Sequence, residues 1–218
     1  MYVPAIYRAP DPSWIVDLIR GHPLALLTSN GDGAPNATHV PVILPDQDRA
    51  ESAGLDGITL LGHMNRSNPH WSALADGMTV LLVFHGPQSY VSPVVYGVTP
   101  ASPTWDFTAV HVRGVLTTIQ DRAETLAVVR STVRTFESRF GQDWDMSTSL
   151  DYFARIVPGV GAFRITITGA EGMFKLSQEQ PDGVRERVLR EFAGRESDSC
   201  RGLARLMVNL RPTARTGT

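Results

Sequence analysis

The sequence predicts a mixed α+β fold built around a closed or partly open β-barrel, with helices at its periphery. The chain contains about seven short apolar runs of strand length, which are interrupted by only a few amphipathic segments. These strands and helices do not alternate regularly, as a βαβ sheet requires. No glycine-rich dinucleotide or phosphate-binding fingerprint follows any of the runs. A barrel therefore explains the pattern better than a doubly wound sheet.

The first predicted elements are a helix and a β-hairpin. Asp11 suits the cap of the helix, Pro12 suits its first position, and the apolar residues that follow are spaced to form one buried stripe that stops at Gly21. Residues 24–29 and 38–44 are predicted to pair as a hairpin, because a turn sequence Asn-Gly-Asp-Gly separates them.

The rest of the chain continues with further strands and helices. The predicted strands are residues 58–64, 79–84, 89–95, 110–119 and 160–168. The predicted helices are residues 68–75, 122–140, 150–157, 183–192 and, more weakly, 203–210. A polar loop is expected at 46–56 and a frayed end at 212–218. The composition becomes charged and arginine-rich after Lys175, so we expect a barrel domain at 1–178 and a C-terminal helical extension at 179–218.

Length, composition and charge exclude several classes of protein. The 218 residues suit one core domain with an appendage, and 42% hydrophobic residues exclude a disordered chain. The formal net charge of −2 and the pI near 6.3 provide no basic field for nucleic acid. The arginines of residues 185–195 are interleaved with glutamates, and no helix-turn-helix signal is present, so a DNA-binding regulator has little support.

The expected location follows from the cysteine count and the apolar runs. Cys200 is the only cysteine, which excludes an internal disulfide and favours a reducing compartment. No run approaches the roughly 18 apolar residues of a membrane span, and no secretory leader pattern is present at the start. We therefore expect a cytoplasmic protein that binds neither nucleic acid nor a membrane.

Polar residues gather in four short segments at predicted strand ends, namely 38–41, 62–71, 86–93 and 103–111. Loops and strand ends on a rigid scaffold are where sites usually lie. Five of the six histidines lie in or beside these segments, but none has the spacing of a zinc site. Each histidine has a plain structural alternative as a hydrogen-bonded residue of the fold.

Two cations in the chain are informative. Arg66 precedes a helix start at Pro69, where a guanidinium and free helix amides suit a phosphate or carboxylate; the alternative is a solvated surface arginine. Lys175 is the only lysine among 20 cationic residues, and lysine, unlike arginine, loses its proton when buried. The alternative for Lys175 is an interface salt bridge.

Taken together and in order, the polar segments resemble the PaiB family of split-barrel proteins. The matching motifs span residues 1–178 and are Met1-Tyr2-Val3-Pro4, Thr38-His39, Gly62-His63, Asn68-Pro69, Gly86-Pro87, Tyr90, Ser92, Tyr96, Pro103-Thr104-Trp105, Val110-His111 and Lys175-Leu176-Ser177-Gln178. The resemblance implies a flavin-reductase-like split β-barrel that forms a homodimer, with ligand sites at the subunit interface. Members of the family are FMN-binding proteins or transcriptional regulators.

The chain departs from the usual PaiB pattern in ways that resemble one branch of that family. Val95 stands where the family has tryptophan, His85 where it has glutamine, and His70 where glutamine or leucine is common. The loss of bulk and the added imidazoles suit a larger planar cofactor with a metal centre better than FMN. The pattern is similar to that of the haem-dependent piperazate synthases, which close an N–N bond in N-hydroxy-L-ornithine to form L-piperazic acid.

The resemblance implies a cofactor, haem b, with FMN as the alternative, and a set of site residues. His63 is the first candidate for the iron ligand and His70 the second, while His39, His85 and His111 stay open. Arg66 would hold a haem propionate or, in the alternative, a flavin phosphate. The predicted cofactor-binding residues are His63, Arg66, Asn68, His70, Trp105 and His111, and the predicted catalytic residues are Lys175, Tyr90 and Tyr96.

Overall fold

The structure is a computed structural model that describes residues 1–45, 54–142 and 144–210. Most of the predicted polar loop at 46–56, and all of the predicted frayed end at 212–218, lie outside these residues.

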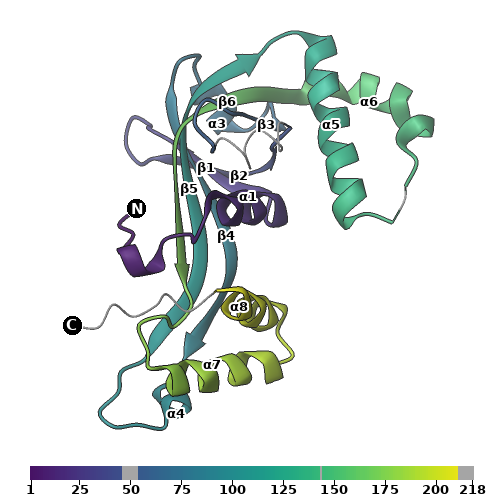
Figure 1. Ribbon diagram of the computed structural model, residues 1–218. Helices are drawn as coiled ribbons and strands as arrows, with labels where there is room; N and C mark the ends of the chain where they lie inside the picture. Colours follow the sequence, from purple (N-terminus) through teal and green to yellow (C-terminus); the bar gives the residue numbers. More distant parts are fainter. Residues whose placement is uncertain (46–53, 143, 211–218) are drawn as a thin grey trace.

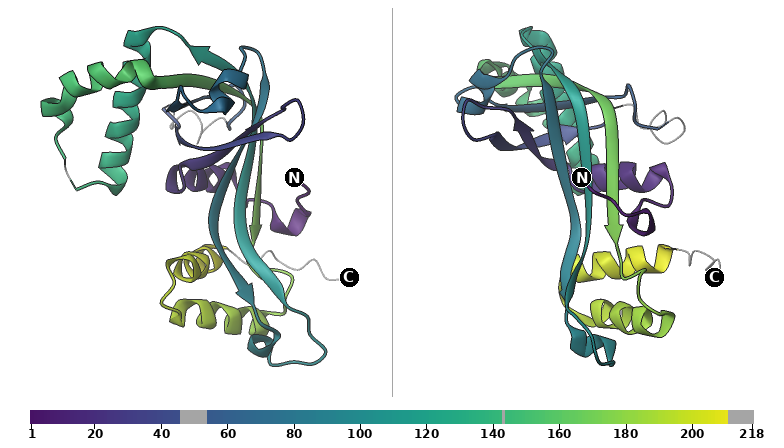
Figure 2. Two further views of the ribbon diagram at one scale, coloured as in Figure 1. Left: turned by 180° about the vertical axis from the view of Figure 1, so that it is seen from behind. Right: turned by 90° about the vertical axis from the view of Figure 1, so that its left-hand side faces the viewer.

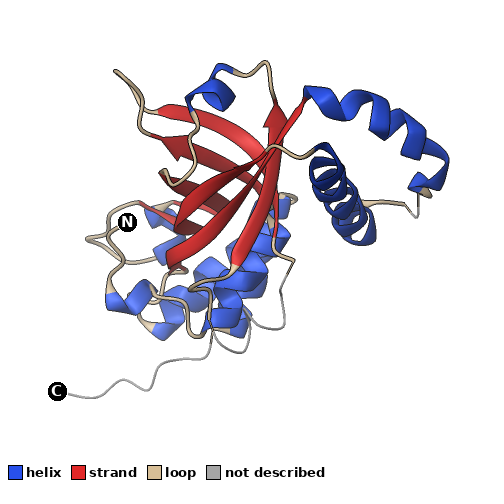
Figure 3. Cartoon of the chain, turned by 90° about the horizontal axis from the view of Figure 1, so that it is seen from above, coloured by secondary structure: helices blue, strands red, loops and turns tan. Residues whose placement is uncertain are grey.

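A closed antiparallel barrel forms the centre of the described chain (Figure 3). Its strand order is β1-β2-β3-β6-β5-β4, and β4 pairs back onto β1 to close it. This confirms the predicted α+β barrel class. The strands are β1 (Leu24–Ser29), β2 (Asn36–Ile43), β3 (Thr59–Asn65), β4 (Thr79–Val91), β5 (Thr104–Ile119) and β6 (Val160–Lys175).

Three of these strands are longer than the sequence predicts. The runs predicted separately at 79–84 and 89–95 belong to one strand, β4, because a register shift between His85 and Gln88 lets its pairing with β5 continue. The prediction was wrong for the last residues of the second run, because Ser92 caps a short helix, α4 (Pro93–Tyr96). The three long strands extend together beyond the barrel (Figures 1 and 2).

The helices lie outside the barrel and confirm the predicted helical segments. Helix α8 starts five residues earlier than predicted, because the Ser197 side chain caps it by accepting a hydrogen bond from the Cys200 amide at 3.4 Å. None of the helices in the described part of the chain has the length and apolarity that a membrane span requires. The remaining helical elements are η1 (Ala5–Tyr7), α1 (Pro12–Gly21), α3 (Pro69–Ala73), α5 (Arg122–Phe140), η2 (Met146–Ser149), α6 (Leu150–Ile156), η3 (Val157–Gly159), α7 (Asp182–Gly194) and α8 (Asp198–Asn209).

The C-terminal helices α7 and α8 share the core of the barrel strands. Helix α8 packs against β4, and α7 packs against α8 and α4; both helices lie on the same side of the long strands as α1 (Figure 1). Val188 and Phe192 of α7 and Leu203 of α8 are fully buried and belong to the same apolar cluster as the barrel interior. The predicted domain boundary at residue 178 falls in the turn between β6 and α7, so the extension is a separate segment of chain but not a separate core.

We expect Phe192→Ala to destabilise the whole chain by about 3–5 kcal/mol, because it empties a core position that the barrel and the C-terminal helices share. Urea denaturation followed by tryptophan fluorescence and by circular dichroism measures the effect. Both probes should shift together. Val208→Ala, at a side chain that is 68% exposed on α8, is the matched control and should change stability by less than about 0.5 kcal/mol. Separate transitions for the two probes would show that the extension folds independently.

Candidate functional site

His63 lies on the outer face of β3, where its side chain is partly buried. It shares this face with Leu61, whereas Leu60 and Met64 point into the barrel core. Its Nδ1 atom is buried and has no hydrogen-bond partner among the described residues. Burial lowers the pKa of His63 below its ordinary value, so its imidazole is neutral near pH 7. A neutral imidazole with an unused nitrogen is the form that binds a metal ion.

Arg66 is fixed in place just beyond the end of β3. Its Nε atom donates to the Val160 carbonyl at 2.9 Å, and its guanidinium lies over the Trp71 ring, 5.3 Å from the ring centroid. Trp71 packs so closely on Gly161 that a Cβ atom there would lie 2.5 Å from the ring, so this approach requires glycine. The Nη atoms of Arg66 have no hydrogen-bond partner among the described residues, which leaves a positioned cation three residues from His63.

Asn68 and His70 hold the barrel together rather than facing outward. His70 is buried, with its Nε2 atom 3.0 Å from the Ser29 hydroxyl and its Nδ1 atom 2.9 Å from the Thr38 hydroxyl. Asn68 accepts a hydrogen bond from the His70 amide at 2.9 Å and donates to the Thr38 hydroxyl at 3.3 Å. Both ring nitrogens of His70 contact hydroxyl groups of the protein, so neither is available for the cofactor binding that was predicted for it. The helix amide expected to help Arg66 bind an anion is likewise occupied by the Asn68 cap.

A second group of predicted residues lies at the far end of the long strands. Tyr90 and Trp105 face each other across β4 and β5 with ring centroids 6.2 Å apart, and their side chains are 44% and 53% exposed. Lys175 is the last residue of β6; its Nζ atom donates to the Thr104 hydroxyl and lies 5.8 Å from the centroid of the Tyr7 ring. Tyr7, which reaches this group from η1, was not predicted as a site residue, because no motif singled it out.

Tyr96 and Asp106 are the buried members of this second group. The Tyr96 hydroxyl has no hydrogen-bond partner among the described residues, and burial, followed by the nearby Asp106 and Glu179 carboxylates, raises its pKa. Asp106 is 0% exposed, and burial raises its pKa to about 6 despite two hydrogen bonds from Ser177. The phenol therefore stays neutral and able to donate a proton, whereas Asp106 changes charge in the range of physiological pH.

His111 lies between the two groups, in the middle of β5. It pairs with Val83 of β4 and Glu171 of β6. Burial, followed by the positive charges of the N-terminal amine and Arg113, lowers its pKa. The Glu171 carboxylate beside it binds the N-terminal amine at 2.9 Å and Arg113 at 3.1 Å, so the surroundings of His111 are an ion cluster.

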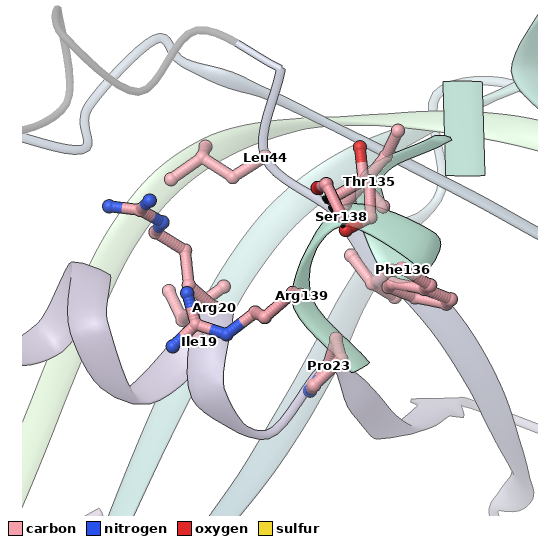
Figure 4. A pocket seen from close by; sticks show the side chains of 10 residues that line it. Ile19, Arg20, Pro23, Leu44, Thr135, Phe136, Ser138 and Arg139 are labelled. Carbon is pink, nitrogen blue, oxygen red and sulfur yellow. Dashed lines mark hydrogen bonds between the residues drawn. The ribbon is translucent and has the colours of Figure 1, made fainter. Parts of the chain in front are cut away.

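The structure thus divides the predicted residues into two groups at opposite ends of the molecule (Figure 1). His63 belongs to β3 and Arg66 follows it, whereas Tyr90, Trp105 and Lys175 belong to the outer ends of β4, β5 and β6, and Tyr96 belongs to α4. Figure 1 shows β3 and α3 at the barrel end, and α4 and α7 at the opposite end. The cleft of about 200 Å³ between α1, β2 and α5, which Figure 4 shows with Arg20 and Arg139 in its wall, contains none of these residues.

Comparison with known proteins identifies the family. The model of the "Putative FMN-binding domain" family matches residues 1–169, more than three quarters of the chain. The chain belongs to this family. The matched residues include the whole His63 group and end within β6, six residues before Lys175, so the family match does not include the C-terminal helices.

Relatives of this FMN-binding-domain chain are known from several organisms. The protease synthase and sporulation protein PAI 2 of Bacillus subtilis is 24% identical over 95% of this chain and 96% of the relative. An uncharacterised protein of Emericella nidulans is 26% identical over the same shares. The PAI 2 match supports the PaiB resemblance read from the motifs.

Solved structures share the fold of the family. A conserved hypothetical protein of Mycobacterium tuberculosis superposes with a TM-score of 0.57 at 14% identity, covering 83% of this chain and 94% of its own. The FAD and haem binding protein of Mycobacterium smegmatis superposes with a TM-score of 0.55 at 16% identity, covering 78% and 73%. At these identities the likeness shows the fold.

We expect His70 to contribute to the acid sensitivity of the fold. Because burial lowers its pKa, the unfolded chain binds a proton more readily, so the stabilisation that depends on neutral His70 is present above about pH 6.5 and is lost as the pH falls. His70→Asn should make the fall in unfolding free energy between pH 7 and 5 shallower, by up to about 1.4 kcal/mol per pH unit.

Urea denaturation at several pH values measures this slope. His85→Asn, at an exposed histidine of β4, is the control and should leave it unchanged. An unaltered slope in His70→Asn would show that the bridging contacts of His70 do not restrict its protonation.

Proposed function

We propose that this FMN-binding-domain family member is a haem-dependent piperazate synthase, which converts N-hydroxy-L-ornithine, hydroxylated on its side-chain nitrogen, to L-piperazic acid. The observation that carries the proposal is the buried, unpartnered Nδ1 atom of the neutral His63 imidazole. A buried polar atom without a partner costs free energy, so a site that keeps one normally satisfies it with a ligand. The alternative function is that of an FMN-binding PaiB-like reductase or transcriptional regulator.

Two residues at the end of β3, His63 and Arg66, would supply the groups that haem b requires. A haem iron needs only one ligand from the protein, and a histidine is the commonest choice. Arg66, three residues after His63, has Nη atoms without a hydrogen-bond partner in the described chain, and these would suit an acidic substituent of the cofactor. FMN would find the same cation for its phosphate, but the amide at the start of α3 is already bonded to Asn68. The fold is compatible with either cofactor, since the related Mycobacterium smegmatis structure is named as binding FAD and haem.

The reaction needs acid and base groups but no net oxidant. The α-amine nitrogen bonds to the hydroxylated nitrogen while the N–O bond breaks, and the hydroxide leaves as water with the proton that the amine loses. When bound, haem iron would supply a Lewis acid that polarises the N–O bond. The neutral Tyr96 phenol would give a proton to the leaving oxygen, and Lys175, held by Thr104, would handle the proton of the α-amine or bind the carboxylate. Tyr90 and Trp105 would exclude water from the ring that forms.

A single chain does not bring these groups to one substrate. Lys175 lies thirteen residues further along β6 than Ala162, the strand partner of His63. At roughly 3.3 Å per residue, this separation is about 40 Å along the strand, several times the length of a five-carbon amino acid. We therefore propose a homodimer in which His63 and Arg66 of one subunit face Lys175 of the other. The exposed aromatic pair Tyr90 and Trp105 supplies the apolar surface that such an interface covers.

We expect purified protein titrated with haemin to give a saturable Soret band at one haem per subunit. His63→Ala should weaken haem binding by at least about 100-fold, because the loss of outer-sphere contacts alone costs 10–100-fold in metal affinity. His22→Ala, at the one histidine that is not a candidate ligand, is the matched control and should bind as the unaltered protein does. Yellow protein that titrates with FMN and shows no Soret shift would instead support the alternative.

Mixing two inactive variants tests the shared site. In a dimer formed from a His63→Ala chain and a Lys175→Gln chain, one site keeps both side chains if each site draws on two subunits. Random reassortment of equal amounts should then restore about a quarter of the cyclase activity, because half of the dimers are mixed and each holds one intact site. Piperazic acid formation, measured by mass spectrometry, reports the activity. No recovery in a mixture shown to contain mixed dimers would place the two groups in separate sites.

A further inference from the structure

The turn that follows Lys175 is held in an unusual backbone conformation. Ser177 is the only described non-glycine residue with a positive φ, at 57°, a region that costs free energy for residues with a side chain. Gln178 braces the same turn, accepting from the Leu176 amide at 2.6 Å and donating to the Phe174 carbonyl at 2.5 Å. Because these hydrogen bonds hold the turn in one conformation, Lys175, which precedes it, has one defined position.

Asp106 is a fully buried residue that also stabilises this turn. Its two carboxylate oxygens accept hydrogen bonds from the Ser177 amide at 3.2 Å and the Ser177 hydroxyl at 2.6 Å. Both residues are 0% exposed, and they connect β5 to the chain 71 positions later. Burying a carboxylate is costly, and a neutral side chain of similar shape would fill the position at lower cost. The stability of the fold therefore gives no reason for an acid at this position.

We propose that Asp106 is a positioning residue for Lys175, acting through Ser177 and through its own negative charge. This inference rests on the proposed function of Lys175 and assigns Asp106 a part in it. By fixing the left-handed turn, Asp106 holds the Lys175 ammonium against the Thr104 hydroxyl and the Tyr7 ring. The Lys175 charge is in turn one of the causes that favour the carboxylate form of Asp106, so the two side chains attract each other once the carboxyl group is ionised.

The charged and titratable groups around Asp106 set the pH range of this effect. They are Lys175 of β6, Glu179 after the turn, Tyr7 of η1 and Tyr96 of α4. Burial and the Glu179 charge favour the neutral acid, while Ser177 and Lys175 favour the carboxylate. Because the pKa of Asp106 in the folded chain lies near 6, above that of an unfolded aspartate, its ionisation lowers stability as the pH rises through about 6. Asp106→Asn should thus preserve stability at pH 8 while it releases Lys175.

The experiment uses the fact that Lys175 is the only lysine of the chain. Trace acetylation with acetic anhydride, followed by mass spectrometry of the peptide that contains Lys175, measures the reactivity of this one amine in the folded protein. For Asp106→Asn we expect the acetylation rate at pH 8 to rise about tenfold, with an unchanged or raised thermal midpoint. Ser177→Gly tolerates the positive φ and keeps the backbone amide that bonds Asp106, but it loses the hydroxyl. It should give a smaller rise in the acetylation rate. This second variant keeps the test valid if Asp106→Asn fails to fold.

Asp76 provides a matched control. Its carboxylate accepts from the Thr118 amide at 2.6 Å and the Thr118 hydroxyl at 2.7 Å, the same pattern as Asp106 with Ser177, but at an exposed turn. Asp76→Asn should leave Lys175 acetylation unchanged. A rate in Asp106→Asn and Ser177→Gly equal to that of the unaltered protein would overturn the inference, as would a loss of stability without a change in rate.

The labelling result separates this inference from the proposed function. A protein that binds no haem and forms no piperazic acid, but in which Asp106→Asn still raises Lys175 acetylation, would refute the enzyme and retain the positioning role. An active enzyme in which Asp106→Asn alters neither the labelling nor the pH profile of turnover would refute the positioning role alone.

Discussion

The continuous pairing of β5 with β6 is the constraint on which the rest of the structure depends. The two strands pair from Ile119 and Ala162 in the barrel to Phe107 and Lys175 far beyond it. Their pairing continues past one register shift between Arg113 and Gly114, so this ribbon carries residues a long way from the barrel without a second domain. One face of the ribbon is covered by α1, α7 and α8, whose apolar residues join the barrel core. The other face carries the exposed aromatic pair. Strand length therefore decides which site residues meet within one chain and which do not.

Buried polar groups in this molecule differ in whether the chain itself satisfies them. His70 bonds two hydroxyls and joins β1, β2 and α3, so it belongs to the architecture. His63 and Tyr96 each retain a buried atom without a partner in the described residues. Arg130, Glu137 and Arg185 each retain such an atom as well, but only His63 and Tyr96 are among the predicted site residues. Since unsatisfied buried groups are rare in folded proteins, these two atoms are where a cofactor or substrate has most to contribute. Asp106 falls between the two cases, because its bonds are complete but its charge is not neutralised by a direct ion pair in the described chain.

The sequence predicts the barrel elements well because apolar spacing records burial. It fails where strands leave the barrel: the outer parts of β4 and β5 carry Ser89, Trp105 and Asp106, which break the apolar run. Helix α4 was also missed, because residues 93–96 are apolar and continue the run that predicts a strand. The motifs predicted the site residues. They could not predict the hydrogen-bond partners that define the role of each residue. Thr38 and His70 are 32 positions apart and Asp106 and Ser177 are 71 apart, and only strand register brings them together. Spacing thus found the side chains but could not distinguish the structural histidine from the unpartnered one.

A site divided between two subunits has a thermodynamic consequence for the proposed enzyme. If the cofactor contacts His63 of one chain and the far-end residues of another, its binding free energy is available only to the dimer. Cofactor binding then strengthens assembly, and assembly strengthens cofactor binding by the same factor. The isolated chain offers the cofactor one buried ligand nitrogen and one guanidinium with unpartnered Nη atoms in the described chain, which is a poor enclosure for a large planar ring. A second subunit would enclose the cofactor with apolar side chains and would bring the acid–base residues to it. The complete catalytic site would then form only in the dimer that holds the cofactor.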